Sequence, residues 1–163
     1  FPATELPPDF HSLRIYRSKK GILVRDGHPV IEAYEKAGVM TWELLNRWPA
    51  VCVTAGMKDG GAKSVEGRRV GVVLPYFLTV PYVVARTDFT FEGPLITLRR
   101  FMMDSQFQFR ILPMPEESGP FEPRLVWHHC SHTDPFLQWV RGLVVDAARS
   151  EARLLGVIDT SEE

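Results

Sequence analysis

Three histidines, a cysteine and an aspartate lie within the eight residues 127–134. Neutral imidazole and thiolate are common zinc ligands. In an extended strand His128, Cys130 and His132 share one face, and the intervening histidine points the other way. No fourth ligand is evident, because Asp134 is expected to cap the helix that follows. We therefore predict no metal site, and a small metal-dependent enzyme using the His128/Cys130/His132 cluster stays the third of three hypotheses.

The rest of the sequence lacks the patterns of an enzyme. It contains no Gly-x-Ser-x-Gly elbow. Cys52 lies between Val51 and Val53, which is typical of a buried, unreactive thiol. The glycine-rich stretch 56–61 lacks the Lys-Ser/Thr ending of a phosphate-binding loop. We expect no catalytic activity and no cofactor.

Charge and cysteine content restrict the partners of the chain. Its 19 basic and 20 acidic side chains give a net charge of −1, which argues against DNA binding by this chain alone. The pairs Arg68-Arg69 and Arg99-Arg100 are expected to be solvated. Two cysteines are too few for a disulfide framework and indicate a reducing, cytoplasmic setting. No apolar run approaches the roughly 20 residues that span a bilayer, so we expect no membrane partner.

The elements that must position any site alternate along the chain. Apolar runs predict strands at 13–16, 21–25, 51–53, 69–74 and 125–128, and an alternating apolar pattern predicts one more at 107–112. Capping residues and apolar spacing predict helices at 42–47, 81–86 and 95–105, and a last one from Asp134 through 136–147. Alternating strands and helices indicate an α/β fold.

Several stretches together carry a family resemblance. They are Gly-His-Pro at 27–29, Pro-Tyr-Phe-Leu-Thr-Val-Pro-Tyr-Val-Val-Ala-Arg-Thr-Asp at 75–88, Val-Trp-His-His at 126–129, Asp-Pro at 134–135 and Trp-Val-Arg at 139–141. In this order they resemble the effector-binding (substrate-binding) domain of LysR-type transcriptional regulators, in the subgroup of the NodD- and NahR-like proteins.

The resemblance implies a type 2 periplasmic-binding-protein-like fold with two Rossmann-like lobes. Residues 26–113 would form the distal lobe, and residues 1–25 with 114–163 the remnant of the proximal one. The DNA-binding winged helix-turn-helix and the first elements of the effector domain are absent from this chain, so the N-terminal lobe is expected to be incomplete. The chain begins with Phe1 rather than Met, and we expect that start to be a cut or processed end.

The resemblance also implies a ligand site and a role. Mapped by motif, its two lips are Thr54, Ala55 and Gly56, and Phe77, Leu78 and Thr79. Glycine backbone admits a ligand closely, threonine hydroxyls bind a carboxylate, and an aromatic ring stacks on another ring. The expected effector is a small aromatic acid or phenol that controls a homo-oligomer, a dimer in the simplest case. DNA would be bound only through the domain missing from this chain. A solute-binding or protein-interaction module without a transcriptional role is the second hypothesis.

Overall fold

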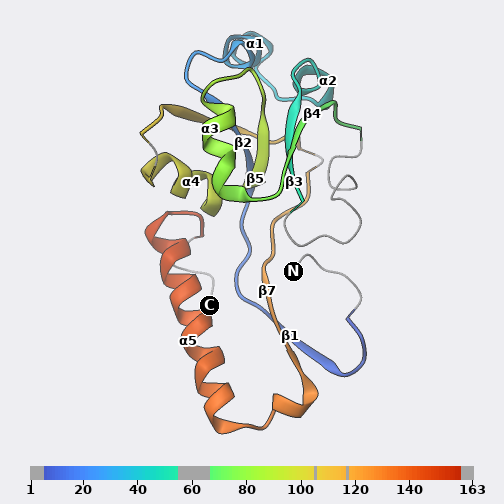
Figure 1. The fold of residues 1–163 in the computed structure, drawn as a ribbon, viewed down its shortest axis with the longest axis vertical. Helices are drawn as coiled ribbons and strands as arrows, with labels where there is room; N and C mark the ends of the chain where they lie inside the picture. Colours follow the sequence, from blue (N-terminus) through green and yellow to red (C-terminus); the bar gives the residue numbers. More distant parts are fainter. Residues whose placement is uncertain (1–5, 55–66, 105, 117, 159–163) are drawn as a thin grey trace. The chain divides into compact units, whose positions relative to one another are not determined.

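The computed structural model describes residues 6–54, 67–104, 106–116 and 118–158. The chain separates into two compact units. Unit 1 consists of Phe1–Lys19 and Pro120–Glu163, and unit 2 is the continuous segment Lys20–Gly119. Figure 1 shows their elements along the chain.

Unit 2 contains a parallel pair of strands and a three-stranded antiparallel sheet. Its central strand β2 (Lys20–Arg25) pairs in antiparallel fashion with β5 (Phe91–Pro94) and with β6 (Phe109–Pro113). The strand β3 (Ala50–Val53) pairs in parallel with β4 (Val70–Leu74). An isolated parallel bridge between Ala50 and Thr90 and two amide hydrogen bonds of 2.8 and 2.9 Å join these two sheets. Because β2 has neighbours on both sides and is buried along four residues, it forms the middle of the unit.

Short helices connect the strands of unit 2. They are α1 (Pro29–Ala37), α2 (Trp42–Leu45), the 3-10 turn η2 (Phe77–Thr79), α3 (Val80–Val84) and α4 (Leu95–Asp104). The predicted cap of α2 is confirmed, since the Thr41 hydroxyl accepts a hydrogen bond of 3.1 Å from the Leu44 amide. The helix α1, whose first residue follows the His28 cap, was not predicted from the sequence.

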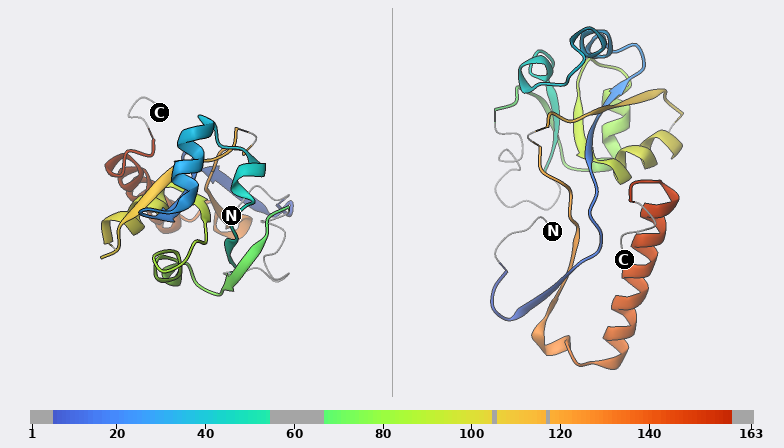
Figure 2. Two further views of the ribbon diagram at one scale, coloured as in Figure 1. Left: turned by 90° about the horizontal axis from the view of Figure 1, so that it is seen from above. Right: turned by 180° about the vertical axis from the view of Figure 1, so that it is seen from behind.

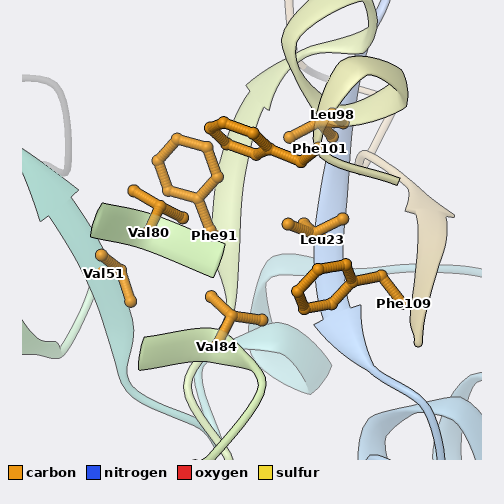
Figure 3. Close-up of a cluster of buried hydrophobic side chains, with 8 residues drawn as sticks. All are labelled: Leu23, Val51, Val80, Val84, Phe91, Leu98, Phe101 and Phe109. Carbon is orange, nitrogen blue, oxygen red and sulfur yellow. The ribbon is translucent and has the colours of Figure 1, made fainter. Parts of the chain in front are cut away.

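The core of unit 2 is aliphatic and aromatic. Figure 3 shows side chains from the sheet, from α3 and from α4 meeting in one cluster: Leu23, Val51, Val80, Val84, Phe91, Leu98, Phe101 and Phe109. Complete burial of one such side chain stabilises the fold by about 1.5–3 kcal/mol. This cluster therefore fixes α3, and with it the turn η2 that immediately precedes it.

Unit 1 combines a two-stranded ladder with a long helix. Strands β1 (Phe10–Arg14) and β7 (Arg124–His128) pair in antiparallel register, and the right-hand view of Figure 2 shows their ribbons next to each other. After the 3-10 turn η3 (His129–Ser131) comes α5 (Pro135–Leu154). The predicted Asp134 cap is confirmed, because its Oδ1 accepts a 3.0 Å hydrogen bond from the Leu137 amide.

The helix α5 is attached to the strand side of unit 1 by polar contacts. Arg149 Nε donates to the Ile15 carbonyl at 2.8 Å. The Ser18 hydroxyl donates to the Val157 carbonyl at 3.1 Å. Within the described ranges no helix is long and apolar enough to cross a membrane.

Several element boundaries differ from the predictions. The first strand occupies Phe10–Arg14 rather than 13–16, and the last helix continues to Leu154. The strand β5 was not predicted, because Phe91–Pro94 contains a glycine and a proline and is held by pairing with the distant β2.

Candidate functional site

Thr54, from one predicted lip, and the turn η2, which carries the other, both follow the carboxyl ends of paired strands in unit 2. Val53, the last residue of β3, pairs with Leu74, the last residue of β4. The half-buried Thr54 continues this pairing, since its amide donates to the Leu74 carbonyl at 3.0 Å. The carboxyl ends of parallel strands meet at the same edge, where ligands of open α/β sheets commonly bind. Thr54 and the turn η2 therefore emerge at a common edge.

The turn η2 presents large apolar side chains to solvent. Leu78 is 79% exposed and Phe77 is 43% exposed. The Phe77 ring lies edge-on to the core ring of Phe91, with centroids 6.2 Å apart. Phe77 is thus anchored on one side and open on the other, as a platform for a planar ring would be.

Thr79 uses its hydroxyl proton within the turn. Its Oγ1 donates to the Tyr76 carbonyl at 2.7 Å, and its amide donates to the same carbonyl at 3.3 Å. The hydroxyl oxygen keeps lone pairs that can accept a hydrogen bond. The remaining predicted lip residues, Ala55 and Gly56, lie outside the described residues.

A buried arginine braces the opposite end of the β3–β4 pair, where the two strands begin. The Arg68 side chain is only 2% exposed and forms an ion pair with Glu92. Its Nη1 donates to Asn46 Oδ1 and its Nη2 to Thr90 Oγ1, both at 2.7 Å. The expectation that Arg68 is solvated is therefore wrong. The sequence Arg-Arg alone does not indicate that one of the two side chains is buried, because the partners of Arg68 lie more than twenty positions away along the chain.

His28, from the Gly-His-Pro turn, is a structural residue. Its Nδ1 accepts a hydrogen bond of 2.9 Å from the Val30 amide and so caps α1. Its proton is consequently placed on Nε2, which has no hydrogen-bond partner among the described residues. Burial lowers the pKa of His28, although the neighbouring Asp88 opposes this effect. The imidazole is held neutral.

The histidines of the 127–134 stretch are arranged differently from the strand expected there. The strand β7 ends at His128, whose Nδ1 accepts a 3.2 Å hydrogen bond from the Cys130 amide at the start of η3. The imidazoles that gather are those of His129, His132 and His11, the last contributed by β1. Among the residues whose positions are described, no group of three or more histidine, cysteine or carboxylate side chains could hold a metal ion. The hypothesis of a metal-dependent enzyme using the His128/Cys130/His132 cluster thus gains no support from the arrangement of these side chains.

Sequence comparison relates the chain to transcriptional regulators. No protein-family model matches it. It is 26% identical over 152 residues to the HTH-type transcriptional regulator SyrM 1 of Sinorhizobium fredii, an alignment that covers 88% of this chain and 43% of the regulator. It is 31% identical over 77 residues to SyrM of Rhizobium meliloti, covering 47% of this chain and 23% of that protein. The chain thus spans less than half the length of the curated relatives it matches.

Solved structures share its fold. The regulatory domain of MexT, a transcriptional activator in Pseudomonas aeruginosa, matches with a TM-score of 0.67 and 22% identity, over 88% of this chain and 68% of that domain. The effector-binding domain of QuiR in complex with shikimate matches with a TM-score of 0.64 and 12% identity, over 91% of this chain and 69% of that one. The chain is a relative of the LysR-family SyrM regulators and has the mixed α/β, type 2 periplasmic-binding-protein-like fold of LysR-family regulatory domains.

Proposed function

We propose that this chain is the effector-binding part of a LysR-type transcriptional regulator. The observation that carries the proposal is the sequence relationship to SyrM 1 along 88% of the chain, joined to the fold of a regulatory domain. In the complete protein a small aromatic effector would control the state of a homo-oligomer bound to DNA in the cytoplasm. The chain itself would sense the effector and perform no chemistry.

The ligand site that we propose contains Thr54, Phe77, Leu78 and Thr79. It also includes Ala55 and Gly56, on the strength of the sequence alone. The exposed face of Phe77 offers a stacking surface for an aromatic ring, and the Leu78 side chain adds apolar area. The Thr79 oxygen accepts a hydrogen bond from a phenol. A phenol satisfies both features, whereas the carboxylate of an aromatic acid, which only accepts hydrogen bonds, would need a donor other than the Thr79 hydroxyl.

The two units correspond, in this proposal, to the two lobes of the regulatory domain. Unit 2 would be the distal lobe, predicted at 26–113, and unit 1 the proximal lobe remnant. An effector that binds one arrangement of the lobes more tightly than another shifts the population toward the first. Through this difference in affinity, binding at the ligand site would change the state of the oligomer.

A thermal-unfolding screen against aromatic carboxylates and phenols tests the site. A ligand at 100 times its Kd adds about 2.7 kcal/mol to the unfolding free energy. At this chain length that is a rise in Tm of about 5–10 °C. We expect Phe77→Ala to weaken binding about tenfold, because it removes the stacking ring.

Phe136→Ala is the matched control. Phe136 is an exposed phenylalanine on α5 in unit 1, at 66% exposure, and its removal should leave binding unchanged. Equal loss of affinity in both variants would contradict the site. If Phe77→Ala leaves the affinity unchanged but substitutions elsewhere in unit 2 abolish binding, the ligand site lies elsewhere in unit 2, and the effector-binding role still stands.

A further inference from the structure

Three imidazoles from two distant parts of the sequence form one stack in unit 1. The rings of His11 and His132 lie nearly parallel with centroids 4.0 Å apart. His11 Nε2 lies 2.9 Å from His129 Nδ1. The antiparallel register of β1 and β7, in which His11 is opposite Trp127, brings these residues together.

The hydrogen bonds of the stack require an unprotonated nitrogen on each accepting ring. Trp127 Nε1 can only donate, so His132 Nδ1 accepts its hydrogen bond of 3.2 Å and carries no proton. Between His11 Nε2 and His129 Nδ1, one nitrogen donates and the other accepts. If both of these nitrogens carry protons, two N–H groups face each other and the hydrogen bond is lost.

The charged groups around the stack oppose its protonation. From α5, Arg141 lies with Cζ 4.8 Å from the centroid of the Trp127 ring and donates to the carbonyls of Ser131 and His132 at 3.1 and 2.9 Å. Its fixed positive charge remains next to the rings. The other titratable side chains on the surrounding elements are the Cys130 thiol on η3, His128 and Arg124 on β7, and Arg14 on β1.

Carboxylates do not compensate for this charge. Asp134 uses Oδ1 to cap α5. Asp9 contributes its backbone carbonyl, which accepts the His129 amide at 2.7 Å. Across the described parts of unit 1, no ion pair joins a carboxylate to His11, His129 or His132. Each added proton therefore meets other positive charge and no negative partner.

We propose that His11, His129 and His132 form a proton-sensitive latch, which fastens β1 to the η3 turn when the rings are neutral and releases it when they are protonated. This inference stands apart from the effector-binding proposal. Loss of solvent around the ring and then the neighbouring His132, His129 and Arg141 hold the pKa of His11 below its ordinary value. The latch therefore contributes fully above the ordinary histidine pKa of about 6.5 and is lost as the pH falls through the lowered pKa.

Proton and nitrogen NMR of the full chain tests the latch directly. We would follow the His11 Cε1–H resonance and the Trp127 indole N–H resonance, assigned with Trp127→Phe, from about pH 7.5 to about pH 5. Both should move together as the pH falls, and the His11 resonance should do so with a midpoint below about 6.5. Hydrogen-exchange protection of the His129 amide should fall about tenfold for each unit by which the His11 pKa lies below its ordinary value. An indole resonance that stays constant over this range, or a His11 midpoint at or above 6.5, would overturn the proposal.

Two matched substitutions locate the effect. His132→Asn places an amide oxygen where Nδ1 was, so the oxygen accepts from the Trp127 indole at every pH and the indole resonance should stop titrating. His128→Asn keeps an acceptor for the Cys130 amide while removing a histidine outside the stack, and should leave the titration unchanged. A wild-type titration in His132→Asn, or its loss in His128→Asn, would refute the latch.

Discussion

Arg68 Nη2 donates to Thr90 Oγ1 at 2.7 Å, and both side chains are buried beside the first residues of β3 and β4, at the end opposite to Thr54 and η2. Thr90 is itself held by backbone hydrogen bonds to Pro49 and Val51. One guanidinium therefore ties the chain after residue 66 to the junction between β3 and β5.

Removing this guanidinium should destabilise the protein. Arg68→Ala leaves the Glu92 carboxylate and the oxygens of Asn46 and Thr90 without their donor. Loss of one partner from such a buried pair typically costs about 3–5 kcal/mol. Urea unfolding of the variant measures the loss.

Arg69→Ala is the control for this prediction. Arg69 is the exposed neighbour, and its replacement should change the unfolding free energy by no more than about 0.5 kcal/mol. Equal effects of the two substitutions would show that the buried network contributes nothing particular.

The buried cap His28 should make stability depend on acid. Because its pKa is lowered in the folded state, the unfolded chain binds the proton more readily. The contribution of His28 is complete above about pH 6.5 and is lost as the pH falls through the lowered pKa.

Denaturant unfolding at a series of pH values checks the role of His28. His28→Asn retains a side-chain oxygen to cap the Val30 amide, and asparagine is a favoured N-cap. We expect the variant to lose part of the acid-dependent decrease in unfolding free energy. An unchanged pH profile would mean that the decrease comes from other groups, such as the histidine latch.

Two glycines should respond to alanine in opposite directions. Gly142 lies within α5 with no atom within 4 Å of an added Cβ. Gly142→Ala should therefore stabilise the chain by about 0.8–1 kcal/mol, from helix propensity alone. At Gly71 an added Cβ would lie 2.7 Å from Pro49 Cβ and 2.9 Å from Phe89 Cζ. Gly71→Ala should destabilise the chain by about 1–3 kcal/mol.

Differential scanning calorimetry distinguishes these outcomes. Gly142→Ala should raise Tm by about 2–4 °C. A decrease would indicate that the exposed face at Gly142 is packed against something in solution. If Gly71→Ala leaves Tm unchanged, Pro49 and Phe89 shift to accommodate the added Cβ more easily than their positions suggest.

Local signals explain what the sequence analysis predicted correctly. Thr41 and Asp134 cap helices through hydrogen bonds within three residues, so the capping pattern alone locates the starts of α2 and α5. The type 2 periplasmic-binding-protein-like fold followed from the family resemblance, which the structural matches bear out.

Long-range contacts explain what it missed. The strand β5 forms by pairing with β2, where Gly93 lies opposite Gly21. The composition of Phe91–Pro94 alone does not indicate this pairing. His11 joins the histidine stack through the register of β1 against β7, and the inward turn of Arg68 depends on Thr90 and Glu92. The helix α1 was missed for another reason: proline at a first helical position and at a turn look alike in sequence.

The arrangement of unit 2 has a practical consequence for dissecting the protein. It is one uninterrupted stretch of chain, whereas unit 1 is assembled from two. Its two ends run next to each other, because Gly21 at the start of β2 pairs with Pro113 at the end of β6. A segment with adjacent ends and its own apolar core resembles a domain inserted into another domain. Such a segment can be expressed separately, or its ends can be joined to make a circular permutant. Expression of Lys20–Gly119 alone would therefore isolate the proposed ligand edge from the histidine stack.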